Sequence, residues 1–277
     1  MPPMVFVAVL AGAILHAGWN AIVKSAGEKF LTTILITSTA AVIAAAALPL
    51  LSSPVPSSLA YAALSAVFQI IYFVILTRAY HSSDMSQSYP LMRGSAPVLV
   101  AIVSALVLRE RLSVPGWAGV LAVCCGIIAI AATGRSGDPR GVRFALLNGV
   151  VIACYTLIDG LGVRHSGAPA AYTAWVVLFT GVPLGAWGIV RNRLRFWPYL
   201  RQHWPLGLAG GLATSLSYGL ALWAMTLAPI AVVAALRETS ILFGTLIAGV
   251  VLRERIGAVR IASACIIAGG AIALRLA

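Results

Sequence analysis

The sequence predicts an all-α integral membrane protein with ten transmembrane helices, arranged as two inverted five-helix repeats. Composition is the first observation: 61% of the 277 residues are hydrophobic and 9% are charged, whereas a soluble domain averages about 25% charged residues. The second is a series of ten apolar runs, each long enough to cross a bilayer. The third is a segment of the first half that returns in the second half.

The repeated segment begins at Arg93 and has the sequence RGSAPVLVAIVSALVLRERL. It returns from Arg237 as RETSILFGTLIAGVVLRERI, 144 residues later. Each copy has a cation at its start, an apolar run of about 15 residues and an Arg-Glu-Arg cluster at its end, so each nearly crosses a bilayer core as a helix. The repeat indicates that the chain consists of two related halves.

Apolar length and turn signals place the spans, in chain order, at about 3–23, 31–51, 58–80, 86–108, 114–133, 142–163, 170–190, 204–227, 229–252 and 256–275. The start, MPPM, lacks the basic stretch of a cleavable signal, so we expect the first run to remain as a span. The link from Gly134 to Arg143 is the most polar one. It divides the chain into two predicted domains, 1–134 and 142–277.

Five spans in each half have a topological consequence. Two related halves with an odd number of spans must lie in the membrane with opposite orientations. This inverted-repeat architecture is typical of secondary transporters, in which the halves rock around a binding site near the midplane. The sequence therefore predicts alternating access to a central site.

The net charge of +12 does not indicate nucleic-acid binding. The arginines lie in short links between apolar runs, where they set topology and contact anionic lipid headgroups. We therefore expect the lipid bilayer and a small-molecule substrate as partners, and no nucleic acid.

Motifs of metal and cofactor chemistry are absent from the sequence. The four cysteines lie in apolar runs and show neither metal-ligand nor disulfide spacing. The sequence contains no GxxxxGK[ST], HExxH or GxSxG motif. We expect no metal, no cofactor and no enzymatic activity, and a membrane-embedded transferase is the weakest alternative.

Arg93 and Arg237 are the strongest candidates for the binding site, because equivalent positions in two inverted repeats are brought to symmetric places. Converging arginines form a site for a carboxylate or a phosphate-like group. Glu238 stands where the first copy has Gly94, and it can hold an ammonium group or a coupling proton. The alternative is structural: Arg93 pairs with Asp159 or with Glu238 in a buried bridge.

Other polar residues within spans also require explanation, because charge inside a bilayer is costly. His16, Trp19 and Asn20 share one helical face, and an interhelical hydrogen bond is their alternative role. Tyr155 and Asp159 lie one turn apart, and Asp159 can couple to protons or serve as a helix cap at the interface. We place Tyr218 in the cavity. Of Tyr89, Tyr172, Trp175 and Trp223, we expect those near span ends, Tyr172 included, to lie in the interfacial aromatic belt. The Arg-Glu-Arg clusters are expected to be span terminators and interfacial salt bridges.

The Arg-Glu-Arg ends of two spans, the count of ten spans and the doubled half resemble the EamA family of the drug/metabolite transporter superfamily. The opening HAGWNAIVK, from His16 to Lys24, and the stretch from Tyr155 to Gly160 resemble one branch of it. The resemblance implies transport of amino acids, other small metabolites or drugs, often linked to proton movement. It also implies a cavity lined by spans one, three, four, six, eight and nine.

Together these observations predict a proton-linked secondary transporter of a small polar or zwitterionic metabolite, such as an amino acid. We expect a multi-pass protein of the plasma membrane, the inner membrane of a bacterium, as a monomer or homodimer. A lipid flippase or a scaffold without transport is the alternative. The expected substrate-binding residues are His16, Trp19, Asn20, Arg93, Tyr155, Tyr218 and Arg237, with Asp159 or Glu238 for proton coupling.

The orientation of the termini is predicted differently by two arguments. With a cytoplasmic N-terminus, the inner links and the tail would hold Arg109, Arg111, Arg164 and Arg275, and the other basic residues of the links would lie outside. The positive-inside rule therefore favours termini outside the cytoplasm. The family resemblance implies termini inside it. We follow the charge count of this chain.

Overall fold

The computed structural model describes residues 1–82, 85–132, 139–250 and 257–276. The described residues are almost entirely helical and include no strand. The helices are α1 (Pro3–Ser25), α2 (Lys29–Ala47), a 3-10 turn (Leu48–Leu50), α3 (Ser58–Ser82), α4 (Met85–Leu106), α5 (Val114–Ala131), α6 (Pro139–Ser166), α7 (Pro169–Arg191), α8 (Arg193–Met225), α9 (Ile230–Arg237), α10 (Ser240–Val250) and α11 (Ala258–Leu276).

Ten helical segments of the described chain are long and apolar enough to cross a membrane, and α9 with α10 supplies the ninth. Helices suit this setting because a bilayer offers the backbone no external hydrogen-bond partners. Local signals set their ends. At the start of α5, for example, the Ser113 hydroxyl accepts a hydrogen bond from the Gly116 amide at 3.2 Å, a standard N-cap.

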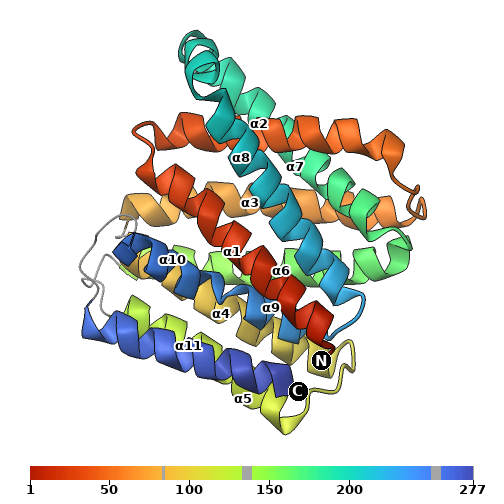
Figure 1. Ribbon diagram of the computed structural model, residues 1–277, viewed down its shortest axis with the longest axis vertical. Helices are drawn as coiled ribbons and strands as arrows, with labels where there is room; N and C mark the ends of the chain where they lie inside the picture. The colour runs from red at the N-terminus through yellow and green to blue at the C-terminus, as the bar shows by residue number, and fades with distance from the viewer. Residues whose placement is uncertain (83–84, 133–138, 251–256, 277) are drawn as a thin grey trace.

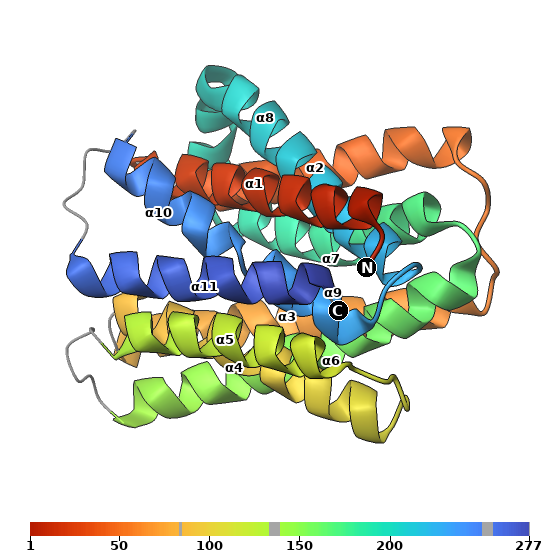
Figure 2. The same ribbon diagram turned by 60° about the horizontal axis from the view of Figure 1, so that its bottom comes forward.

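The helix contacts follow an approximate two-fold relation between spans one to five and spans six to ten. α1 packs on α8 as α3 packs on α6, and α2 packs on α8 as α3 packs on α7. Three further pairs, α2 with α7, α4 with α9 and α5 with α11, each join a span to its own counterpart. α1 begins at the end of the molecule that holds both termini and α6 begins at the opposite end (Figures 1 and 2). The two repeats are therefore inverted, as predicted.

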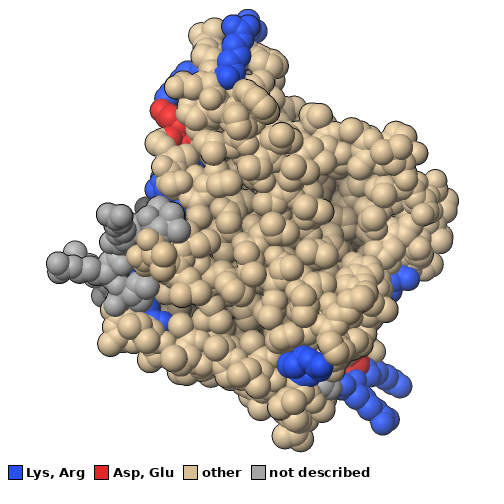
Figure 3. Space-filling view, viewed as in Figure 1, with Lys and Arg blue, Asp and Glu red and all other residues tan. Residues whose placement is uncertain are grey.

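The surface agrees with a membrane setting. On the face shown in Figure 3, charged side chains lie near the edges and the broad centre carries none. The two termini meet at one end, where Arg275 Nη1 donates a hydrogen bond of 2.6 Å to the carbonyl of Met1. We call this the termini end of the molecule.

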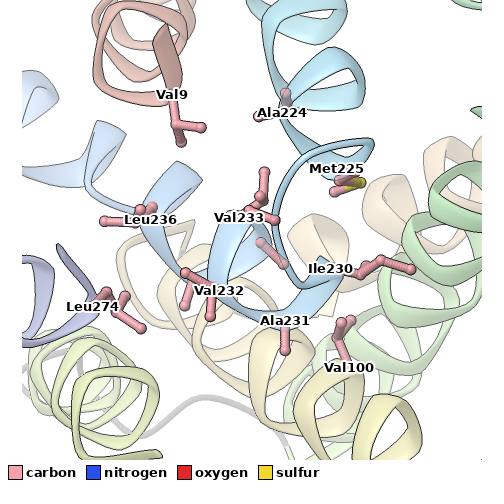
Figure 4. Packing of buried hydrophobic residues seen from close by; sticks show 14 of the residues in the cluster. Val9, Val100, Ala224, Met225, Ile230, Ala231, Val232, Val233, Leu236 and Leu274 are labelled. Atoms are coloured by element: carbon pink, nitrogen blue, oxygen red, sulfur yellow. The ribbon is translucent and has the colours of Figure 1, made fainter. Parts of the chain in front are cut away.

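The main hydrophobic core is centred on α9. Every residue of this short helix from Ile230 to Leu236 is buried. Figure 4 shows Val9 of α1, Val100 of α4 and Leu274 of α11 directed toward it. A helix this short stays in place in the middle of a membrane protein because its neighbours enclose it on all sides.

The ninth span differs from the single continuous helix that the sequence predicts. It breaks at Glu238 and Thr239, between α9 and α10. There the Thr239 hydroxyl donates a bond of 2.6 Å to the Leu236 carbonyl, and the backbone follows with tighter i to i−3 bonds. At the equivalent place in the first repeat, the Ser95 hydroxyl donates to the Met92 carbonyl at 3.3 Å, and α4 remains continuous.

The eighth span also differs from its prediction, because residues 193–203 are helical and not part of a link. α8 begins at Arg193 and bends at His203, whose φ and ψ are −119° and 15°. Its first turns extend beyond α2 at the top of Figure 1. Phe196 explains their helical state, because it is buried against Ile34 and Leu35 of α2.

Candidate functional site

A small cavity lies between the two repeats, near the middle of the helices. Its volume is about 10 Å³, close to the lower limit for one ordered water molecule. Three of the lining residues are charged: Arg93 of α4, and Arg237 and Glu238 at the α9–α10 break. The other described lining residues are Ala96, Pro97, Val100, Ile152, Tyr155, Thr156, Met225 and Ala234. The structure therefore brings the two equivalent arginines to one cavity, which is too small for a metabolite in this conformation.

Arg93 and Glu238 form an ion pair across the two repeats. Arg93 Nε lies 2.8 Å from Glu238 Oε2, and both side chains are almost completely buried. The contact is an ion pair without hydrogen-bond alignment, and Arg93 Nη2 has no hydrogen-bond partner among the described residues. The structural alternative with Glu238 is thus present, and the alternative with Asp159 is not.

Arg237 forms no ion pair with an acid among the residues that the structure describes. Its guanidinium carbon lies 4.9 Å from the centre of the Tyr218 ring, in a cation–π contact, and its Nε has no hydrogen-bond partner among the described residues. The helix break explains the position, since Arg237 is the last residue of α9. The cavity wall therefore carries two cations and one anion, a net charge of +1.

Asp159 is fully buried in α6 and accepts hydrogen bonds from three hydroxyl groups. Ser65 of α3 donates to Oδ2 at 2.7 Å, and Tyr172 of α7 donates to Oδ1 at 3.1 Å. Tyr218 of α8 also donates to Oδ2. The alternative role of Asp159, a helix cap at the interface, is wrong, because α6 continues to Ser166 and Asp159 is buried within it.

Gln69 of α3 orients two of these hydroxyls. Its side-chain nitrogen donates to Ser65 Oγ at 3.1 Å and to Tyr218 Oη at 3.2 Å. Its oxygen accepts a bond of 3.4 Å from Thr180 of α7. The bonds therefore all run in one direction, from Thr180 through Gln69 and the two hydroxyls to the Asp159 carboxylate.

Most of this cluster is not evident from the sequence. Tyr172 was expected near an interface, but it is completely buried and binds Asp159. Ser65, Gln69 and Thr180 are common polar residues in apolar helices, and their convergence depends on three different helices. The one available signal was the spacing of Ser65 and Gln69, which places them one turn apart on α3.

His16, Trp19 and Asn20 have a different arrangement from the predicted one. The rings of His16 and Trp19 are 5.3 Å apart and nearly perpendicular. Asn20 donates a bond of 2.7 Å to the carbonyl of His16 in its own helix, and no hydrogen bond joins it to another helix within the described part of the chain. His16 is buried and within electrostatic range of Arg93 and Arg237. It is therefore near the cavity, although none of the three lines it.

At the termini end, Glu110 of the first Arg-Glu-Arg cluster joins the two repeats. Its Oε1 lies 2.6 Å from Arg164 Nη1, and its Oε2 accepts a bond of 3.0 Å from the amide of Ile230, at the start of α9. Arg164 donates further bonds to the carbonyls of Met225 and Ala228, at 2.7 and 2.9 Å. We call this group the terminal latch.

The terminal latch has the role expected of the cluster, a span terminator with a salt bridge. The chain turns out of α4 at Arg109, which has a positive φ of 56°, and this frees Glu110 to reach α9. The second cluster, residues 253–255, lies outside the described residues, as does the first half of the polar mid-chain link, residues 134–138.

Comparisons with known proteins agree with this architecture. The family described as the EamA-like transporter family matches the chain twice, over residues 3–132 and 139–276. A solved crystal structure covers 100% of this chain and 98% of its own, with a TM-score of 0.77 and 19% identical residues. At that identity the likeness shows a shared fold. No curated protein matches the sequence.

Proposed function

Because the chain belongs to the EamA-like transporter family, we propose that it is a secondary transporter of a small polar or zwitterionic metabolite, such as an amino acid. The substrate crosses the membrane by alternating access, in which the two repeats rock around the cavity. The protein resides in the plasma membrane as a monomer or a homodimer. Its partners are the lipid bilayer and the small-molecule substrate.

The observation that carries this proposal is the unequal pairing of the two arginines. Arg93 is neutralised by Glu238, whereas Arg237 contacts only an aromatic ring among the groups identified around it. One positive charge is left over in a cavity shielded from water. Such a charge favours a carboxylate, because charge-assisted hydrogen bonds to a guanidinium are among the strongest available.

The lining also limits what the substrate can be. Tyr155 and Thr156 supply hydroxyl groups, and Val100, Ile152 and Met225 supply apolar surface. A small molecule with a carboxylate and a short, partly apolar body fits this mixture. The cavity, with a volume of about 10 Å³, must widen before any such molecule enters, and the two repeats meet there between α4 and α9.

Proton coupling completes the proposal. The acids near the cavity are Glu238, which lines it, and Asp159, which is linked to it through Tyr218. Uptake and release of a proton by one of them during the cycle would connect substrate movement to the proton gradient.

Arginine substitution in purified protein tests the proposal. Proteoliposomes are loaded with unlabelled L-amino acids, and entry of a ¹⁴C-labelled amino acid mixture is followed. Arg237→Ala should reduce exchange to the level of empty liposomes. Arg191→Ala is the matched control. Arg191 also stacks on an aromatic ring, that of Trp187 at 5.5 Å, but it lies at the C-terminal end of α7, away from the cavity. Equal exchange by both variants would overturn the assignment of the site.

A further inference from the structure

We infer that Asp159, and not Glu238, carries the coupling proton, and that Tyr218 transmits its protonation state to Arg237, so that proton and substrate carboxylate are transported together. This inference rests on the proposed function and decides between the two acids that it names.

The two acids differ in their partners. Glu238 lies 2.8 Å from a guanidinium nitrogen, and this pairing favours its ionised form. Asp159 has three hydroxyl donors and no ion pair among the described residues. A buried carboxylate without a cation is costly in the bilayer, and neutralisation by a proton removes that cost.

Access to Asp159 is restricted to very small species. Its side chain is completely buried, it does not line the cavity, and hydroxyl groups occupy both of its oxygens. An ammonium group or a metal ion would have to displace those donors. A proton adds to one oxygen without displacing any atom.

The charged and titratable groups around Asp159 come from four helices. They are Tyr155 on α6 itself, Tyr172 on α7, Tyr218 on α8 and Arg237 at the end of α9. α3 contributes the uncharged Ser65 and Gln69. Asp159 is therefore the one acid of this group.

The direction of the hydrogen bonds makes the cluster sensitive to protonation. Both Gln69 N–H groups point at the hydroxyls of Ser65 and Tyr218, so both hydroxyls donate to Oδ2 of Asp159. This arrangement satisfies a carboxylate. When a proton from the aqueous side binds there, the new O–H faces two donors and no acceptor, and one of the two hydroxyls must turn away.

Tyr218 joins this cluster to the cavity. Its hydroxyl contacts Asp159 and the face of its ring contacts the Arg237 guanidinium. A change in the Asp159–Tyr218 bond therefore acts on the arginine that is free to bind the substrate. Tyr172 also donates to Asp159, but no contact joins it to Arg237, so it serves to position the carboxylate.

The charge balance gives the sign of the coupling. The cavity wall has a net charge of +1, and an ionised Asp159 behind Tyr218 offsets it. Protonation of Asp159 removes that offset and strengthens binding of an anionic group at Arg237. By reciprocity the bound anion also favours protonation. Proton and carboxylate therefore bind together and move in the same direction.

The first test detects the proton without any substrate. The sequence has three aspartates, Asp84, Asp138 and Asp159, so Asp84→Asn with Asp138→Asn leaves one. Infrared difference spectra of this variant, labelled with ¹³C at the aspartate carboxyl group, are recorded between alkaline and acidic pH. We expect a labelled carboxylic-acid band to appear at acidic pH while the protein stays folded. Its absence over the whole folded range would overturn the assignment of Asp159.

The second test measures coupling in proteoliposomes with the ¹⁴C-labelled amino acid mixture. With the outside more acidic by about one unit, wild type should accumulate label roughly tenfold, the ratio that one-to-one coupling sustains. Asp159→Asn should still exchange labelled for unlabelled amino acid, but a pH gradient should not drive accumulation of label in its proteoliposomes. Accumulation driven by an acidic interior, or accumulation by Asp159→Asn, contradicts the inference.

Tyrosine variants test the transmission step. Tyr218→Phe should abolish accumulation of label. Tyr172→Phe should still accumulate label, but the pH dependence of that accumulation should shift. Tyr199→Phe is the matched control outside the site, since that hydroxyl bonds to Thr32 at 2.7 Å. If Tyr218→Phe accumulates label like Tyr199→Phe, transmission through Tyr218 is wrong. If wild type exchanges no amino acid at all, the proposed function fails, and the infrared result still decides the role of Asp159.

Discussion

Arg164 Nη1 lies 2.6 Å from Glu110 Oε1, and this ion pair joins the first repeat to the second at the termini end. The same two side chains also bind the backbone on both sides of the turn between α8 and α9. The terminal latch therefore fixes the start of α9, the helix that ends at Arg237. A change at the latch should therefore alter access to the cavity.

Loss of the terminal latch should open the cavity toward the termini end. Glu110→Gln removes the charge that pairs with Arg164, so the turn between α8 and α9 is held less firmly. In a background without the four native cysteines, a cysteine at Ala234 in the cavity wall reports access by its rate of maleimide modification. We expect faster modification in Glu110→Gln.

The matched control for the latch is Glu28→Gln. Glu28 also forms a close ion pair, with Arg195 at 2.5 Å, but both side chains are largely exposed, and exposed pairs contribute little. In this variant the cysteine at position 234 should react with maleimide at the wild-type rate. Equal rates in the two variants would show that the latch does not close the cavity.

The Arg93–Glu238 pair should be sensitive to the loss of one partner. Glu238→Gln leaves the buried Arg93 without its counter-charge, which typically costs roughly 3–5 kcal/mol. Adding Arg93→Met removes the orphaned charge, so the double variant should regain most of the lost stability. Thermal unfolding of the purified proteins measures both changes. A double variant as unstable as Glu238→Gln would show that the two charges are not energetically coupled.

Gly162 provides the space for the Tyr172 ring. A Cβ atom at this position would lie 2.2 Å from the Tyr172 hydroxyl and 2.6 Å from Tyr61 Cβ. Gly162→Ala should therefore lower stability by about 1–3 kcal/mol through overpacking, and it should disturb the Tyr172 bond to Asp159. Unfolding temperatures of the purified variants measure the loss.

Gly244→Ala is the control, because a Cβ there meets no described atom within 4 Å. It should be neutral or stabilise α10 by up to about 1 kcal/mol, the difference in helix propensity. A loss of stability as large as that of Gly162→Ala would show that the contact with Tyr172 does not distinguish the two glycines.

The termini should lie outside the cytoplasm. The termini end carries Arg109, Arg111, Arg164 and Arg275, and two of these are engaged, Arg164 in the latch and Arg275 on the Met1 carbonyl. The opposite end carries most of the other basic residues of the links, so the positive-inside rule assigns it to the cytoplasm. A fluorescent protein that matures only in the cytoplasm, fused after Ala277, should stay dark. Fluorescence at the level of a cytoplasmic control would reverse the orientation.

The helices could be predicted from the sequence because apolar length is a strong and local signal. The inverted repeats followed from the recurrence of Arg93 at Arg237, and so did the meeting of these arginines at one cavity. The break in the ninth span was missed because no proline or glycine marks it. The polar Glu238, Thr239 and Ser240 in an apolar run were the available signal, and only the structure shows the Thr239 bond that tightens the turn.

The cluster around Asp159 shows where prediction from sequence stops. Its members come from α3, α6, α7 and α8, and no periodicity links residues on different helices. Their hydrogen bonds depend on how Gly162 admits the Tyr172 ring and on how α3 packs against α6. Such contacts are decided by tertiary packing and not by local pattern. The first turns of α8 were not predicted for a related reason. Their arginines resemble those of a polar link, and only the structure shows that Phe196 is buried.

In a transporter made of two identical inverted units, the states open to either side would be images of each other and equal in energy. Here the ninth span, in the second unit, is divided into α9 and α10, whereas its counterpart in the first unit, α4, is one continuous helix. Exchanging the shapes of the two units therefore costs more in one direction than in the other. Under the proposed alternating access, the protein should therefore have a preferred resting side even when no gradient is present, and its two faces should differ in apparent affinity for the same substrate.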